Sequence, residues 1–278
     1  MMAKTIAICN QKGGVGKSTT AVNVGAYLAL SGNRTLLVDL DPQGNATTSC
    51  GIIRATLKKT VYEALVDGLQ IEEAIVASAV ERLDLVPSSY GLAETDQKIS
   101  STNERETILK KIFENIKSRY DVILIDCPPS LGLLTINALV AADCALIPVQ
   151  CEYLSLEGLT ALVQTIDRIK SLWNPHLQIA GIVLTMVDFR VNLTREVQED
   201  VRQFFKEIVC NTLIPRNIRL AESPSFGKPI CLYEPNSAGA QAYRLLTEEL
   251  AMRFGLEQAK EESQHDVKTT RERVSPNS

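Results

Sequence analysis

The feature that most constrains this chain is a glycine-rich turn between an apolar run and a helical pattern. The apolar run Thr5–Cys9 leads into Asn-Gln-Lys-Gly-Gly-Val-Gly-Lys-Ser-Thr at residues 10–19, and a helical pattern covers Lys17–Leu30. Glycines let backbone N–H groups converge on phosphate oxygens, and the dipole of the following helix adds to their attraction for negative charge. A strand, such a turn and a helix in succession predict a phosphate-binding loop.

The turn contains candidate ligand groups and one departure from the standard spacing. Lys17 is expected to reach the β- and γ-phosphates of ATP, and the Ser18 hydroxyl is expected to bind Mg²⁺. Gln11 stands where G-x-x-x-x-G-K-[ST] has its first glycine, and an additional lysine, Lys12, follows it. Lys12 could be an ordinary solvated lysine, but positions in a phosphate loop lie against a highly charged ligand. The predicted nucleotide contacts in the turn are Lys12, Gly13, Gly14, Val15, Gly16, Lys17, Ser18 and Thr19.

Acidic residues end two other apolar runs. Asp39 and Asp41 lie near the end of Thr35–Leu40, on one strand face by the period of two, and Asp126 directly follows Val122–Ile125. Asp126 fits an acid that holds Mg²⁺ through water, because Mg²⁺ sheds its hydration reluctantly. The two earlier aspartates could instead cap a turn before the following proline. Ligands of parallel sheets bind at the carboxyl ends of the strands, where all three acids are expected.

Short apolar, β-branched runs alternate with longer helical patterns along the chain. The predicted strands are Thr5–Cys9, Thr35–Leu40, Leu83–Val86, Val122–Ile125, Cys144–Val149, Ile179–Thr185 and Thr212–Ile214. The predicted helices are Lys17–Leu30, Glu104–Ser118, Leu133–Ala141, Leu156–Leu172, Leu193–Ile208 and Ala238–Phe254. Asn103 is expected to cap the helix that contains Glu106, and Gly32 to end the first helix. The alternation predicts an α/β fold with a doubly wound, mostly parallel sheet flanked by helices, the fold of P-loop NTPases.

Length and composition bound the remaining possibilities. The chain has 278 residues, and we expect a single ATPase domain over residues 1–256. Residues 257–278 are polar and charged, which predicts a disordered tail. The net charge of −4 does not by itself indicate a nucleic-acid binder, so any DNA contact must come from a local basic patch. The seven cysteines are scattered without a C-x-x-C pair and are expected to be small buried hydrophobes. The absence of a signal-peptide pattern predicts a cytoplasmic protein.

The turn at residues 12–19 resembles the deviant Walker A motif of the ParA/MinD ATPase superfamily. In that family the first lysine reaches across a dimer interface to the ATP of the partner subunit. The resemblance therefore implies that Lys12 acts in trans and that Gly13 lies at the interface. Residues 39–45, Asp-Leu-Asp-Pro-Gln-Gly-Asn, resemble the second signature of the family. This implies that Asp41 positions the attacking water and that Asp39 lies near Mg²⁺, so Lys12, Lys17 and Asp41 are the expected catalytic residues.

A later segment, residues 213–230, resembles the small chromosomal ParA proteins of the Soj type. In those proteins the segment after the proline borders the adenine, which implies base contacts for Pro215, Arg216 and Asn217. The resemblance extends over about Lys4–Arg253.

Two arginines, Arg190 and Arg219, align with family positions that contact DNA without sequence preference. The resemblance implies a partition ATPase in which ATP closes a homodimer, the dimer binds nonspecific double-stranded DNA, and a ParB-like partner stimulates slow hydrolysis that releases it. Such a protein would be associated with the nucleoid.

Other branches of the superfamily remain as alternatives. One is a MinD-like, membrane-associated spatial regulator, another a ParA-like ATPase that positions a different cargo, and a third an iron–sulfur carrier or a synthetase. The tail offers only Leu256, Val267 and Val274 as aliphatic anchors, which is too few for an interfacial helix. No membrane partner is therefore expected.

Overall fold

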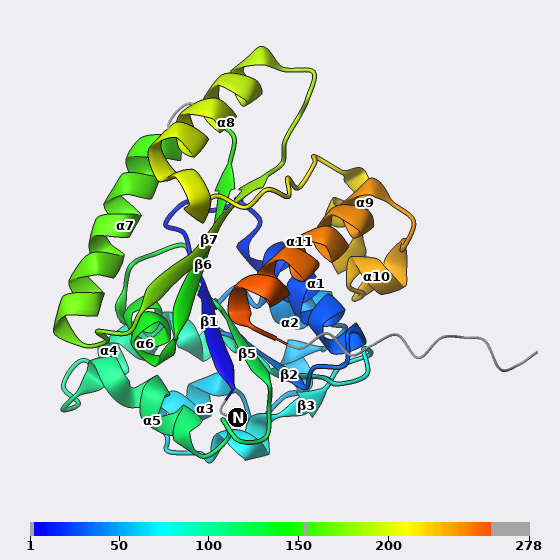
Figure 1. The fold of residues 1–278 in the computed structure, drawn as a ribbon. Coiled ribbons are helices and arrows are strands. Elements are labelled where there is room, and N and C mark those ends of the chain that lie inside the picture. Colours follow the sequence, from blue (N-terminus) through cyan, green and yellow to red (C-terminus); the bar gives the residue numbers. More distant parts are fainter. Residues whose placement is uncertain (1–2, 153–154, 257–278) are drawn as a thin grey trace, which may run out of the picture.

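A seven-stranded sheet with helices on both faces forms the centre of the computed structural model, which describes residues 3–152 and 155–256 (Figure 1). The strand order is β3-β4-β2-β5-β1-β6-β7, and all neighbouring strands are parallel except β3 and β4. The strands are β1 (Lys4–Ile8), β2 (Thr35–Asp39), β3 (Val76–Ala77), β4 (Leu83–Val86), β5 (Val122–Asp126), β6 (Cys144–Gln150) and β7 (Gln178–Thr185). The predicted fold class is confirmed.

Long and short helices connect these strands. The α-helices are α1 (Lys17–Leu30), α2 (Asn45–Ser49), α3 (Val61–Val66), α4 (Thr95–Lys98), α5 (Ile108–Glu114), α6 (Leu133–Ala141), α7 (Ser155–Leu172), α8 (Asn192–Phe205), α9 (Ile218–Glu222), α10 (Ile230–Tyr233) and α11 (Ala238–Phe254). Six short 3₁₀ segments also occur among the described residues: η1 (Arg54–Thr56), η2 (Ile71–Ala74), η3 (Tyr90–Glu94), η4 (Arg105–Thr107), η5 (Lys206–Ile208) and η6 (Ser223–Phe226). None of the helices in the described ranges is both long enough and apolar enough to cross a bilayer.

The sheet separates two apolar cores, and β1 contributes to both. Ile6 and Ile8 face one core, which α1 and α11 cover, whereas Ala7 and Cys9 face the other, to which α3, α5, α6 and α7 contribute. Side chains of a strand alternate between faces, so the consecutive residues Ile6, Ala7 and Ile8 of β1 must all be apolar to serve both cores. The cysteines are small apolar residues of these cores, as predicted: six are buried and Cys231 is partly buried.

The strand register brings the carboxyl ends of three strands together. Asp39 at the end of β2 pairs with Asp126 at the end of β5, and Asp126 pairs on its other side with Ile8 at the end of β1. The glycine-rich turn begins two residues after Ile8 and leads into α1. The topology thus places the turn directly beside both acids, as ligand sites in open α/β sheets require.

Thr212–Ile214 does not form the strand that the sequence predicts. Ile214 exchanges backbone hydrogen bonds with Leu184 and Val187, and the adjoining Pro215 forms an isolated parallel bridge with Val187, but the described segment does not extend into a strand. The amide of Thr212 donates to the Glu249 carboxylate at 2.9 Å rather than to a neighbouring strand. Pro215 has no N–H with which to continue a ladder. The segment instead runs parallel to β7 through isolated contacts, from the bridge of Val209 with Ile182 to that of Pro215 with Val187.

The predicted helix over Glu104–Ser118 is shorter than expected. Glu104 adopts a left-handed conformation with φ of 54°, 3₁₀ turn η4 follows, and α5 covers only Ile108–Glu114. The predicted cap by Asn103 is therefore wrong, and α5 begins after Thr107 without a side-chain cap. Gly32, with φ of 93°, follows the end of α1 as predicted. The predicted tail, residues 257–278, lies outside the described residues.

Candidate nucleotide-binding site

The glycine-rich turn forms one wall of a cavity of ≈ 310 Å³ at the carboxyl end of the sheet. Gly14 and Gly16 have φ of 75° and 88°, which β-carbons disfavour, and Gly16 directly precedes α1. Nothing lies within 4 Å of the position that a Cβ would take on Gly13 or Gly14. The turn therefore presents open backbone to the cavity. Its lining comprises Gly13, Gly14, Gly16, Lys17, Ser18, Thr19, Asp41, Gln43, Asn45, Ser49, Pro129, Met186 and Pro224.

The two lysines of the turn have different environments. The Lys17 side chain is buried, and its Nζ donates a hydrogen bond of 3.0 Å to the backbone carbonyl of Lys12. Burial lowers the pKa of Lys17, whereas the carboxylates of Asp126 and Asp41 raise it. The Lys12 side chain is 45% exposed and forms an ion pair with Glu152. Lys17 thus points into the site, and Lys12 lies at its rim.

Asp126 is a fully buried acid whose charge is only partly compensated by its surroundings. Neither carboxylate oxygen has a hydrogen-bond partner of good geometry among the described residues. Burial raises the pKa of Asp126 well above its ordinary value, the nearby charge of Asp39 raises it further, and the Ser18 hydroxyl lowers it. A buried acceptor of this kind beside a serine hydroxyl fits a magnesium ion, which prefers oxygen ligands. No group of three or more His, Cys, Asp or Glu side chains in residues 3–152 and 155–256 could hold a metal alone, so nucleotide phosphates and water would complete its shell.

Asp39 is also buried, but hydrogen bonds satisfy its carboxylate. Oδ2 accepts from the amide and the hydroxyl of Thr47 at 2.8 and 2.6 Å, and Oδ1 accepts from the amide of Asp41 at 3.2 Å. Burial raises the pKa of Asp39 to about 6, although the bonds from Thr47 lower it. Asp39 therefore anchors the start of α2 to β2 beside the acid expected to hold the metal.

Asp41 lies in the loop after β2 and lines the cavity. Its side chain is buried, and Oδ1 accepts a hydrogen bond of 2.9 Å from the backbone amide of Gln43. The second oxygen, Oδ2, makes no bond to the residues that the structure describes. Asp41 is thus oriented from one side, which suits an acid that positions water.

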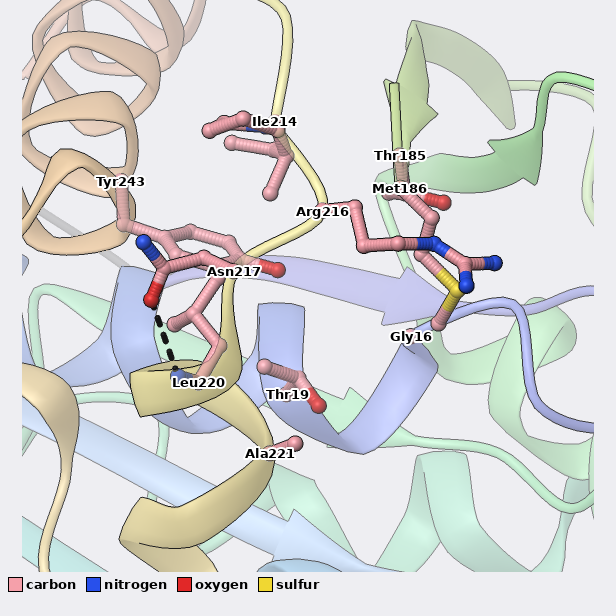
Figure 2. A pocket seen from close by; sticks show the side chains of 11 residues that line it. Gly16, Thr19, Thr185, Met186, Ile214, Arg216, Asn217, Leu220, Ala221 and Tyr243 are labelled. Atoms are coloured by element: carbon pink, nitrogen blue, oxygen red, sulfur yellow. Dashed lines mark hydrogen bonds between the residues drawn. The ribbon is translucent and has the colours of Figure 1, made fainter. Parts of the chain in front are cut away.

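A second cavity of ≈ 270 Å³ adjoins the first (Figure 2). The two share Gly16, Thr19 and Met186, so together they form a continuous surface large enough for a base and its phosphates. The three predicted base contacts, Pro215, Arg216 and Asn217, all line the second cavity together with Thr185, Ile214, Leu220, Ala221 and Tyr243.

The Asn217 side chain lines this cavity and caps a helix. Its Oδ1 caps α9 by accepting from the amides of Arg219 and Leu220 at 2.9 and 3.3 Å, the latter drawn in Figure 2. Only its amide nitrogen is left to meet a ligand. The Arg216 backbone amide is bound to the carbonyl of Val187 at 3.0 Å, which fixes the segment against the end of β7.

Six residues that line the second cavity were not predicted from the sequence, and Met186 and Tyr243 are the most informative of them. Met186 has an unusual positive φ of 52° and reaches both cavities. Its position directly after the predicted strand ending at Thr185 was a usable signal. Tyr243 lines the cavity from α11, and its hydroxyl lies 3.1 Å from the hydroxyl of Thr20. Nothing in the helical pattern around Tyr243 distinguishes it from a core residue.

The arginines predicted to contact DNA lie outside both cavities. Arg190 precedes α8, is 87% exposed and forms hydrogen bonds of 2.8 and 2.6 Å with the Asp188 carboxylate. Arg219 in α9 pairs with Glu222 at 2.9 Å and is half exposed. Each arginine is accessible, but each is paired with an acid in this structure.

Known proteins match this chain over most of its length. A family model described as an AAA domain matches residues 3–179. The sporulation initiation inhibitor protein Soj of Bacillus subtilis is 52% identical, covering 90% of this chain and 99% of Soj. The chromosome partitioning protein ParA of Myxococcus xanthus is 48% identical, covering 91% of this chain and 89% of ParA.

Solved structures agree on the fold and on the ligand. A cobyrinic acid a,c-diamide synthase from Mycobacterium smegmatis, solved with an ATP analogue and magnesium, is 35% identical with a TM-score of 0.80, covering 91% of this chain and 96% of that one. The combination of a phosphate loop with an additional lysine, a buried acid whose charge is only partly compensated and these relatives has one consistent explanation. The chain belongs to the ParA/MinD superfamily of P-loop ATPases, in the branch of the Soj and ParA chromosome-partitioning proteins.

Proposed function

We propose that this chain is a ParA-type partition ATPase whose ATP-bound form is a homodimer with nonspecific affinity for duplex DNA. The observation that carries the proposal is the contrast between its two loop lysines. Lys17 is buried in its own site, whereas Lys12 stands half exposed at the rim beside glycines with open space in front of them. That placement suits a cation that reaches the nucleotide of a second subunit. Supplied in this way, the charge makes hydrolysis depend on dimerisation.

In the proposed reaction, water attacks the γ-phosphorus, the bond to the bridging oxygen breaks with its electron pair leaving on ADP, and the proton of the water passes to the phosphate product. Asp41 orients the water through its unengaged oxygen. Lys17 binds the β- and γ-phosphates, and Pro215, Arg216 and Asn217 hold the base. Ser18 and Asp126 would hold Mg²⁺, which supplies charge neutralisation at the phosphates; Asp39 fixes the neighbouring loop.

The proposed cycle places the protein in the cytoplasm, on the nucleoid while it is a dimer. Arg190 and Arg219 would contact DNA phosphates, and a ParB-like protein would accelerate hydrolysis and release the dimer. Dimerisation doubles the number of such arginines on one particle, and phosphate contacts make binding steeply salt-sensitive. The names of the curated relatives support chromosome segregation as the process.

The test is size-exclusion chromatography with light scattering, with Mg²⁺ and ATP present or absent. We expect the parent to shift from monomer to dimer with ATP and Asp41→Ala to accumulate the dimer. Lys17→Ala should lose ATP binding, and Lys12→Ala should bind ATP but hydrolyse it more slowly by about 10³-fold, the scale of a trans-acting cation. A parent that stays monomeric at saturating ATP, or a Lys12→Ala variant with parental turnover, would contradict the proposal.

A second function is suggested by the synthase among the similar structures, which is 35% identical to this chain. A synthetase would release ADP only when a small acceptor is present, whereas a partition ATPase hydrolyses ATP in buffer and faster with DNA and its partner. ADP release measured without any acceptor therefore separates the two.

A further inference from the structure

Arg54 reaches the loop that carries Asp41 from outside the cavity. It begins 3₁₀ turn η1 and is half-buried. One guanidinium nitrogen donates to the carbonyl of Pro42 at 2.6 Å, and another donates to the carbonyl of Gln43. The fork of the arginine thus binds two successive carbonyls of this loop.

The first of these bonds is directly connected to Asp41. The carbonyl of Pro42 and the N–H of Gln43 belong to the same planar peptide unit. Arg54 holds the carbonyl side of this unit, and the N–H on its opposite side donates to Asp41 Oδ1 at 2.9 Å. A cation on the carbonyl fixes the orientation of the peptide and strengthens the bond made by its N–H.

The surroundings hold the guanidinium in this position. The Arg54 Cζ lies 4.1 Å from the centre of the Tyr90 ring, a cation–π contact. Gly44, with φ of 67°, gives the guanidinium room, because a Cβ on Gly44 would collide with it. The Arg54 Nε is buried. Arg54 therefore stacks on an aromatic ring, binds two carbonyls and lies close against Gly44, unlike a freely solvated surface arginine.

We propose that Arg54 is a positioning residue for hydrolysis, which holds the Asp41 carboxylate in the orientation that places the attacking water. The proposal rests on the water-positioning role of Asp41 in the proposed function. It requires that loss of Arg54 lower kcat while leaving ATP binding intact, because the phosphate loop and the base cavity do not contact this residue. A purely structural arginine would change the melting temperature and not the turnover of the folded protein.

The experiment compares basal ATP turnover, KM and the affinity for a non-hydrolysable ATP analogue in full-length variants at saturating Mg²⁺. Arg54→Ala is expected to lower kcat by about 10- to 100-fold, the scale of a small misplacement of a reacting group, with KM and analogue affinity within about twofold of the parent. Arg54→Lys, which keeps the charge but not the fork, is expected to fall between Ala and the parent. Tyr90→Ala should give a smaller loss of kcat than Arg54→Ala.

Arg82 is the matched control. It is an exposed arginine that also donates to a backbone carbonyl, that of Gly32 at 3.0 Å, but it precedes β4 and lies far from the carboxyl ends of the strands. Arg82→Ala should keep the parental kcat.

The outcomes separate this proposal from the proposed function. A parent without ATP turnover overturns the proposed function and this proposal with it. A parent that hydrolyses ATP alongside a folded Arg54→Ala with equal kcat overturns the Arg54 proposal alone, as does a loss confined to KM. If Arg54→Ala does not fold, the same criteria apply to Arg54→Lys and Tyr90→Ala.

Discussion

Asp126 carries a buried carboxylate whose oxygens have no hydrogen-bond partner of good geometry among the described residues. A group in this state destabilises the ligand-free protein by ~1–3 kcal/mol. Its folded-state pKa is raised, so the folded protein binds the proton more tightly than the unfolded chain does. The stability of the ligand-free protein therefore falls as pH rises above the ordinary carboxyl pKa of about 4.

Asp126→Asn removes this charge, and we expect it to raise the melting temperature of the protein in EDTA at pH 8. The gain should shrink as the pH is lowered to 5, because the raised pKa of the parental acid favours uptake of a proton. The variant should lose the additional stabilisation that Mg²⁺ and ATP give the parent. Thermal unfolding with and without Mg-ATP at both pH values measures all three effects. Equal melting temperatures of variant and parent in EDTA at pH 8 would contradict the interpretation.

The Asn217 side chain has an oxygen that caps α9 and a nitrogen that is available to a ligand, so one substitution can remove the nitrogen and keep the cap. Asn217→Asp keeps an oxygen that can cap α9 and removes the donor that faces the base cavity. Since aspartate is also a good N-cap, stability should hardly change. ATP affinity should fall about tenfold, which corresponds to loss of one hydrogen bond. Titration with a fluorescent ATP analogue and a melting curve test the two expectations. An unchanged affinity would remove Asn217 from the base contacts.

At the scale of elements, the predictions that succeeded came from long periodic segments. The predicted bounds of α1, α6 and α11 agree with the structure, and the other long helices differ only at their ends. Failures occurred where contacts between distant residues decide the local structure. Thr212 gives its amide to Glu249, and Glu104 adopts a left-handed conformation before α5. Thr60 and Glu63 form a capping box at α3, a spacing that the sequence already contains.

In the connection between β7 and α8, Arg190 forms an ion pair with Asp188. Arg190 lowers the pKa of Asp188 to about 2, so the acid stays charged at every pH at which DNA binding is measured. Asp188→Asn should therefore free Arg190 and raise nonspecific DNA affinity by about two- to fivefold, the scale of an exposed ion pair. Arg190→Glu should lower it. Filter binding of duplex DNA with ATP, at increasing salt, gives both values. Parental affinity and salt slope in both variants would exclude Arg190 from the DNA surface.

At the scale of the whole molecule, sequence reasoning located the phosphate loop and the acids at the carboxyl ends of strands, and the structure brings them together. It could not find Tyr243 or Arg54. Tyr243 reaches the site from α11. Arg54 binds backbone carbonyls, which every residue has, so no sequence pattern marks its partners. Both depend on contacts that exist only after the chain has folded.

Because the proposed mechanism requires two occupied subunits, turnover should rise sigmoidally with ATP. We expect a Hill coefficient between 1 and 2 in steady-state assays at protein concentrations where the ATP-bound dimer forms. Lys12→Ala should abolish the sigmoidal dependence along with the activity. A hyperbolic curve from the parent would argue against hydrolysis across two subunits.

In this structure the Lys17 ammonium donates a hydrogen bond of 3.0 Å to the backbone carbonyl of Lys12. Under the proposed mechanism, a triphosphate bound by Lys17 would draw the ammonium away from this carbonyl and free the backbone of Lys12. A subunit would then present Lys12 to its partner only after binding its own ATP, which would account for the sigmoidal dependence.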